Sequence, residues 1–104
     1  MITATIDNVP GRKIVEVLGT VRGNTVRARH VGKDIAAVFK NVVGGEIDDY
    51  TKLMAESREQ SFDRMLAEAR ARGADAVVGI RYATSAISSG AAEILVYGTA
   101  VKLD

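Results

Sequence analysis

Hydrophobic and polar positions along the chain follow two periods, and the change of period separates predicted strands from predicted helices. Residues 13–22, 75–84 and 92–102 are rich in β-branched side chains and alternate as strands do. The first of these strands is expected to stay extended as far as Arg27. A shorter strand is predicted at residues 2–6, before a group of turn formers around the single proline. Gly23-Asn24 is interpreted as a bulge or turn.

Helical spacing occupies the middle of the chain. A short helix is predicted where Ile35, Val38, Phe39 and Val42 recur at i, i+3, i+4 and i+7, ending at Gly44-Gly45. A long helix is predicted at about residues 47–72, with Phe62 near the centre of its apolar stripe and expected in the core. Arg58 falls inside the same stripe. The fold class predicted is α+β, an antiparallel sheet in one layer and two helices in the other.

Alternation divides each strand between two faces of the sheet. One set carries no charge and is predicted to lie under the helices: Val15, Val17, Gly19, Val21, Ala76, Val78, Ile80, Tyr82, Ile94, Val96, Gly98 and Ala100. The other set mixes large apolar side chains with single charges, as subunit interfaces do: Ile14, Glu16, Leu18, Thr20, Val77, Gly79, Arg81, Ala83, Glu93, Leu95, Tyr97, Thr99 and Val101. The pattern therefore favours a homo-oligomer, with the second face and the N-terminal strand at the contacts, over a monomer with scattered surface apolar groups.

Composition narrows the classes of function. The chain has 104 residues, the size of one domain, and is 47% hydrophobic but only 5% aromatic. Its 14 basic and 13 acidic residues nearly balance, which disfavours nucleic acid and anionic membranes as partners. There is no cysteine, so disulfides, thiolate metal sites and cysteine nucleophiles are excluded. No signal peptide or membrane span is recognised, which favours the cytoplasm.

Candidate metal ligands are few. His30 is the only histidine, and Asp34 follows it at helical spacing. Transition-metal sites need three or four ligands, so this pair would need copies from other subunits. A hydrogen-bonded or solvent-facing histidine is the alternative. Glu46, Asp48 and Asp49 precede the long helix, where carboxylates are favourable without any metal.

Candidate ligand-binding residues are charged groups within apolar segments. Arg58 on the long helix, with Arg81, Glu93 and Tyr97 on the strands, could form a polar pocket, or ion pairs within or between subunits. The basic run at residues 22–33 could bind an anion, although it lacks a glycine-rich phosphate loop. No catalytic residue is identified, because the serine-rich segment around Ser88 has no histidine near it in the sequence.

The whole chain resembles the YbjQ-like family. The resemblance is carried by four segments: Asn24-Thr25-Val26-Arg27-Ala28, Val31-Gly32-Lys33-Asp34-Ile35, Gly44-Gly45-Glu46-Ile47 and Gly90-Ala91-Ala92-Glu93-Ile94-Leu95-Val96-Tyr97-Gly98-Thr99-Ala100-Val101. It implies a single domain over residues 1–104, with a dodecin subunit-like β-α-β-β core and extra N-terminal strands that help to assemble a homopentamer. The family is uncharacterised and sometimes labelled heavy-metal-binding, and no residue motif for a metal, cofactor or ligand transfers to this chain.

Three functions of different classes follow from these observations. The first is a non-catalytic homo-oligomer, a pentamer by resemblance, that binds a small ligand or a partner. The second is a metal-binding or metal-responsive protein that uses symmetry-related His30 or carboxylates. The third is an enzyme with an intersubunit site formed by Arg58, Glu93 and Tyr97.

Overall fold

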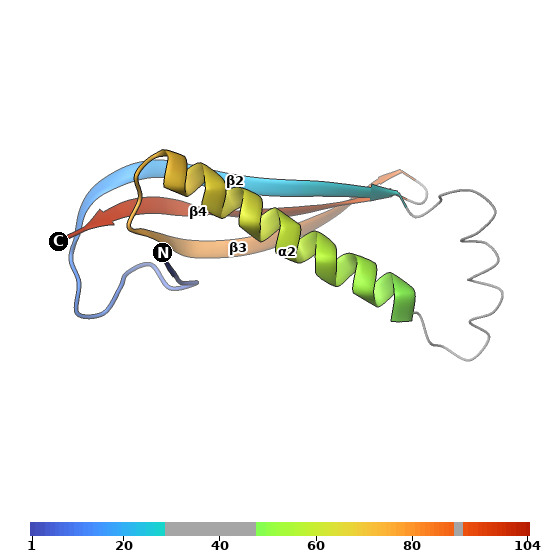
Figure 1. Ribbon diagram of the computed structural model, residues 1–104, viewed down its shortest axis with the longest axis horizontal. Helices are drawn as coiled ribbons and strands as arrows, with labels where there is room; N and C mark the ends of the chain where they lie inside the picture. Colours follow the sequence, from blue (N-terminus) through green and yellow to red (C-terminus); the bar gives the residue numbers. More distant parts are fainter. Residues whose placement is uncertain (29–47, 89–90) are drawn as a thin grey trace.

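A computed structural model describes residues 1–28, 48–88 and 91–104 of the chain (Figure 1). Within these ranges it contains four strands and one helix: β1 (Ile2–Thr3), β2 (Ile14–Ala28), α2 (Asp48–Ala71), β3 (Ala76–Ser88) and β4 (Ala91–Leu103). The strands form one sheet in the order β1-β3-β4-β2, and α2 lies obliquely across one face of it (Figure 1). The α+β class and the two layers are thus confirmed.

The sheet is mixed, so the prediction of an antiparallel sheet is wrong at one strand. β2, β4 and β3 are antiparallel, but β1 pairs in parallel with β3, with Ile2 opposite Ala76. The predicted strand at residues 2–6 shortens to two residues because the chain bends after Ala4. Ile6 still accepts a backbone hydrogen bond from Gly79 at 2.9 Å. The predicted short helix around Ile35 lies outside the described residues.

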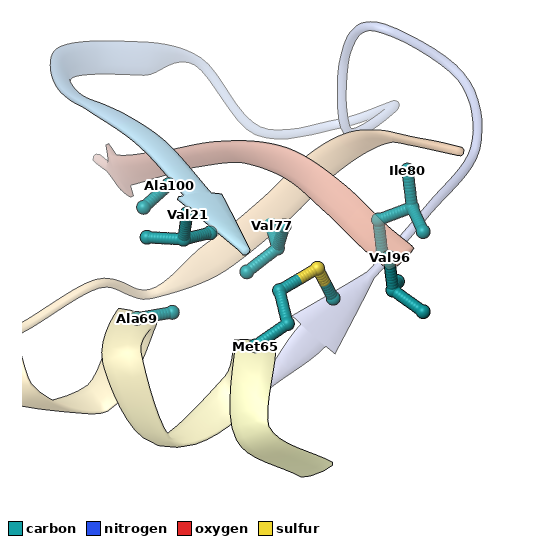
Figure 2. Packing of buried hydrophobic residues seen from close by; sticks show 7 residues of the cluster. All are labelled: Val21, Met65, Ala69, Val77, Ile80, Val96 and Ala100. Atoms are coloured by element: carbon teal, nitrogen blue, oxygen red, sulfur yellow. The ribbon is translucent and has the colours of Figure 1, made fainter. Parts of the chain in front are cut away.

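The main core lies between α2 and the strands β2 and β4. Seven buried residues form it, and Figure 2 shows them meeting from the helix and the sheet: Val21, Met65, Ala69, Val77, Ile80, Val96 and Ala100. Phe62 was expected here, but it is only partly buried and packs against this cluster. Met65, fully buried, takes the central place on the helix.

Small hydroxyl side chains allow α2 to approach the sheet closely. Ser57 and Ser61 are fully buried, and Ser61 Oγ lies 3.0 Å from Thr25 Oγ1 and 2.8 Å from the carbonyl oxygen of Ser57. These hydrogen bonds satisfy groups that would otherwise be costly to bury. The close approach leaves no room at Gly23, where an added Cβ would stand 2.0 Å from the carbonyl oxygen of Ser61. The register runs unbroken through Gly23, so the bulge or turn predicted there is wrong.

Bulges in β2 and β3 change the face of the sheet to which the neighbouring residues point. The register shifts between Ile14 and Glu16 and between Val17 and Gly19 in β2, and between Val78 and Arg81 in β3. A bulge inserts one residue, so the residues beyond it point to the opposite face from the one that simple alternation predicts. The face assignment consequently holds for Val21, Ile80, Ile94, Val96 and Ala100, but it fails for Val17, between the two bulges of β2, and for residues 76–78, before the bulge in β3. Val17 is 65% exposed, whereas Val77 is buried beneath α2.

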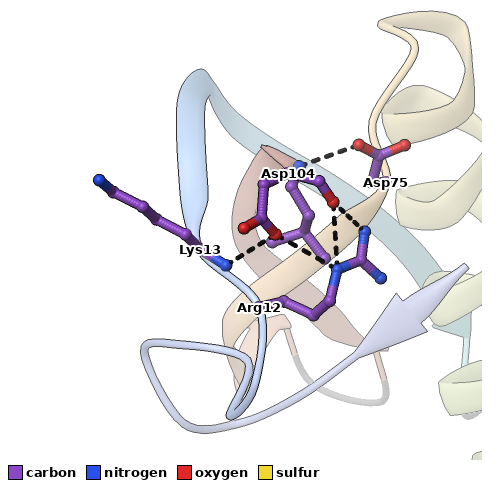
Figure 3. A network of polar contacts seen from close by, with 5 residues as sticks. Arg12, Lys13, Asp75 and Asp104 are labelled. Atoms are coloured by element: carbon purple, nitrogen blue, oxygen red, sulfur yellow. Dashed lines mark hydrogen bonds and ion pairs between the residues drawn. The ribbon is translucent and has the colours of Figure 1, made fainter.

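The opposite face of the sheet is covered at one end by the N-terminal segment. Val9 and Ile14 pack there on a second buried cluster of Ala76, Val78, Val101 and Leu103. Polar contacts hold the same end together (Figure 3): Arg12 Nη2 donates to the carbonyl oxygen of Asp104 at 2.6 Å, and Lys13 N donates to Asp104 Oδ1 at 3.0 Å. Val77 and Val101, predicted in a subunit interface, therefore lie in the chain's own core.

Candidate assembly surface

The other end of that face remains open. Cross-strand pairing places Arg22, Tyr97 and Arg81 in one row, followed by the row of Asn24, Leu95 and Ala83. Tyr97 is 37% exposed and Leu95 is half-buried, although both occupy β4, which is flanked by strands on both sides. The open face is defined here as these two rows with Val26, Glu93 and Ser85, the next row.

The open face gathers three of the four ligand-binding candidates from the sequence. Tyr97 stands directly opposite Arg81, and Glu93, four residues before Tyr97 in β4, lies two rows away on the same face. Arg81 Nη1 donates to the carbonyl oxygen of Thr5 at 2.7 Å, and Glu93 Oε2 accepts a hydrogen bond from Asn24 Nδ2 at 3.1 Å. Both charges are thereby engaged within the chain. Such an arrangement suits a contact surface in which charges fix the register while apolar groups supply the driving force.

Arg58, the fourth candidate, lies apart from these three. It is exposed on α2 and lines an open pocket of about 410 Å³ with Ala55, Glu59 and Tyr82. Arg58 and the pair Glu93 and Tyr97 lie on opposite sides of the sheet, so they do not converge within one chain. Sequence analysis placed Arg58 on the apolar stripe of the helix, which was expected to be buried. The side that is buried carries Ser57 and Ser61, and serine is more often an exposed residue, so the orientation of the helix was misjudged.

Tyr82 was predicted to lie under the helix but is 50% exposed. The reason is that α2 packs over β2 and β4 and scarcely touches β3, which leaves a wedge between α2 and β3 open. Partial burial raises the pKa of the Tyr82 phenol, and the negative charge of Glu59 raises it further, while Arg58 opposes both effects. The wedge thus contains two opposite charges and one aromatic ring.

The outer edge of β2, on the side away from β4, is covered by polar side chains of α2. Arg72 Nη1 donates to the carbonyl oxygen of Leu18 at 3.2 Å, and Arg64 Nη1 donates to that of Asn24 at 2.6 Å. Between these two contacts, Glu68 accepts a hydrogen bond from the backbone N–H of Arg22 at 3.4 Å. Arg64 and Glu68 stand four helical residues apart, a rise of about 6 Å, and their partners Asn24 and Arg22 stand two strand residues apart, about 6.7 Å, so this part of the helix row matches the strand closely.

Comparison with known proteins assigns the family. The family model that matches is YbjQ, described as "Putative heavy-metal-binding", and it spans residues 1–104. The chain belongs to the YbjQ family. Proteins named UPF0145 are close relatives: one from Thermosipho melanesiensis is 58% identical over 103 residues, covering 99% of this chain and 95% of the relative. One from Archaeoglobus fulgidus is 54% identical over 103 residues, with the same two coverages of 99% and 95%.

A solved structure supports the fold of this YbjQ-family chain. It is a crystal structure of a protein of unknown function from the DUF74 family of Pediococcus pentosaceus. The TM-score is 0.68 at 13% identity, and the match covers 100% of this chain and 98% of that one. At this identity the likeness shows the fold alone.

One YbjQ-family chain of this sequence offers few of the donor atoms that heavy metals prefer. Soft metals prefer thiolate and imidazole ligands, whereas the sequence has no cysteine and one histidine. Across residues 1–28, 48–88 and 91–104, no three potential ligands of the His, Cys, Asp or Glu type gather. His30 and Asp34, the two metal candidates, lie outside these ranges. Among the helices of the described ranges, none is long and apolar enough to cross a membrane.

Proposed function

We propose that this protein is a non-catalytic subunit of a homo-oligomer, most simply a closed ring of five, whose assembled form binds a partner or small ligand. The observation that carries the proposal is the open face, where Leu95 and Tyr97 remain accessible on an inner strand. The number five rests on the family resemblance, as do the dodecin-like core and the role of the N-terminal strand. The proposed location is the cytoplasm, as the sequence favours.

Substitution of Leu95 by arginine tests the proposal. Leu95 is only half-buried in the single chain, so the chain should still fold, but an arginine there would place an unpaired charge in the contact. We expect light scattering to report a smaller particle for Leu95→Arg, with unchanged circular dichroism. Ala67→Arg, on the exposed side of α2, is the matched control and should leave the mass unchanged. An unchanged mass for Leu95→Arg would show that the open face is not part of the contact between chains.

The family description favours a second candidate, a metal-binding or metal-responsive protein. Because one chain lacks a suitable donor set, such a site would require His30 and Asp34 from several subunits of the ring. Metal content measured on protein purified without an affinity tag tests this candidate. Metal that is bound in a fixed ratio to the ring and lost in His30→Ala would support it.

A further inference from the structure

The outer edge of β2 is long and rich in residues that favour strands. β2 runs from Ile14 to Ala28, and among the described strands only β4 pairs with it. Val15, Val17 and Val26 are exposed along its length. An edge of this kind attracts other extended chains, because its outward N–H and C=O groups have no partner in the sheet. Native proteins therefore protect such edges with bulges, charges, proline or a covering element.

Bulges interrupt only the beginning of this edge. The register of β2 against β4 shifts twice before Gly19 and is then regular as far as Ala28. Within the regular stretch, Arg22 directs its N–H and Asn24 its C=O away from β4. Residues of a strand direct these groups alternately to its two sides, so those of Thr20 also point outward. The regular stretch is thus the part of the edge that needs a covering element.

Three charged side chains of α2 lie along the regular stretch. They are Arg64, Glu68 and Arg72, each one turn after the last, on the half of the helix that lies beside β2 (Figure 1). We call these three side chains the strap. Each of them forms a hydrogen bond with a backbone group on the outer side of β2. Within the strap, Arg72 Nη2 also donates to Glu68 Oε1 at 2.9 Å, which holds the two side chains over the strand.

The placement of the strap is better explained by the edge than by stability alone. The side chains of Arg72 and Glu68 are 41% and 35% exposed, and ion pairs as exposed as this one contribute little to stability. What the three residues share is their target, since all of them reach backbone groups that another strand would otherwise bond. Gly23 allows this reach, because its lack of a side chain lets the helix lie against β2.

We infer that the strap keeps the outer edge of β2 from pairing with a strand of another copy, and so prevents open-ended polymerisation of the folded protein. The strap acts within one chain, so its role does not depend on the proposed ring and would be the same in a monomer. Removing the strap exposes backbone donors and acceptors along a strand that is already extended. Two such edges from different copies could then pair directly.

Polymerisation of a variant without the strap is the first test. Arg64→Ala/Glu68→Ala removes one base and one acid from the strap, and Asp63→Ala/Arg70→Ala removes one of each from the exposed side of the same helix. During incubation at about 100 µM, we expect the strap variant to form fibres that bind thioflavin T. The wild type and the control should keep their initial mass in light scattering. A strap variant that also keeps its initial mass would overturn the inference.

A proline in the edge separates protection from stability. Thr20→Pro removes one outward N–H without removing a hydrogen bond to β4, and proline on an edge strand hinders pairing. Added to the strap variant, it should lengthen the lag before fibre formation by about tenfold or more. A proline does not restore stability lost elsewhere, so an unchanged lag would mean that the fibres form by another route and would contradict the inference.

Amide hydrogen exchange decides if the combined variant does not fold. Glu68→Ala alone should speed exchange at the outward amide of Arg22 by about tenfold or more, because its hydrogen-bond acceptor is lost. The amides of Val21 and Gly23, which point toward β4, should exchange as in the wild type. An unchanged rate at Arg22 would show that the strap does not cover the edge.

Discussion

Alanine at Gly23 is the substitution that tests the packing of α2 on the sheet most severely. The added methyl would stand 2.0 Å from the carbonyl oxygen of Ser61, 2.5 Å from the backbone nitrogen of Met65 and 2.9 Å from Cβ of Arg64. Two of these atoms belong to the helix backbone, so no rotation of a side chain can relieve the contact. The helix must move outward by about 1 Å or more to restore ordinary carbon–oxygen separations of about 3.3 Å.

The cost follows from what that movement opens. Inserting a methyl into a well-packed core costs about 1–3 kcal/mol even where side chains can adjust. Here the displacement would also loosen the contacts of Met65 and the hydrogen bond between Thr25 and Ser61. We therefore expect Gly23→Ala to lower the free energy of unfolding by about 3–5 kcal/mol, within the range of severe core substitutions.

Reversible urea denaturation at one fixed protein concentration measures this difference, because the stability of an oligomer depends on concentration. Gly11→Ala is the control, since nothing lies within 4 Å of its added methyl. Gly11 has a φ of +83°, so alanine there is expected to cost about 1 kcal/mol from backbone strain alone. If Gly23→Ala cost no more than Gly11→Ala, the helix would not be seated on β2 as described.

Further predictions concern the core, pH and metal. Met65→Ala should lower the free energy of unfolding by about 2–5 kcal/mol, whereas Phe62→Ala, at a half-buried position, should cost less; the reverse order in urea denaturation would place the wrong side chain at the centre. The hydrogen bond from the backbone N–H of Lys13, assisted by Arg12, lowers the pKa of Asp104, so its stabilisation is present above the ordinary carboxyl pKa of about 3.9 and is lost as pH falls through the lower folded value. Asp104→Asn should therefore lower the melting temperature at pH 7 and make no difference near pH 2, and an equal loss at both values would mean that the charge is not responsible. Isothermal titration should find no stoichiometric, sub-micromolar zinc or copper site that persists in His30→Ala, and such a site would contradict our choice of ligand.

The strands and the long helix were predictable because their periodicity extends over many residues. Alternation located β2, β3 and β4, and the helical period located α2 to within one residue at each end. Near the bulges, the face of the sheet to which each residue points could not be predicted. One inserted residue turns the residues beyond it, up to any further bulge, to the opposite face, and it leaves the amino-acid composition of the strand almost unchanged. The parallel pairing of β1 depends on a distant strand and has no local signal.

The candidate site was predictable in part for the same reason. Arg81, Glu93 and Tyr97 were assigned to one face by alternation, and the register confirms that they share it because no shift falls between them in β4 or after Arg81 up to Ala86. Arg58 was placed on the buried side because apolar side chains were used to orient α2. Met65 and Ala69 belong to the apolar stripe and are buried, but the buried row continues at i+4 spacing through Ser57 and Ser61, which small size rather than hydrophobicity would have revealed.

Native mass spectrometry of the untagged protein tests the central claim of a homo-oligomeric ring most directly. The mass of one chain is 11.1 kDa, and the same spectrum would reveal any co-purifying ligand or metal. We expect a single closed species at five times the chain mass, with no ladder of larger assemblies, because a ring leaves no contact surface unfilled. A spectrum containing only the single chain, at concentrations at which the protein is folded, would contradict the account.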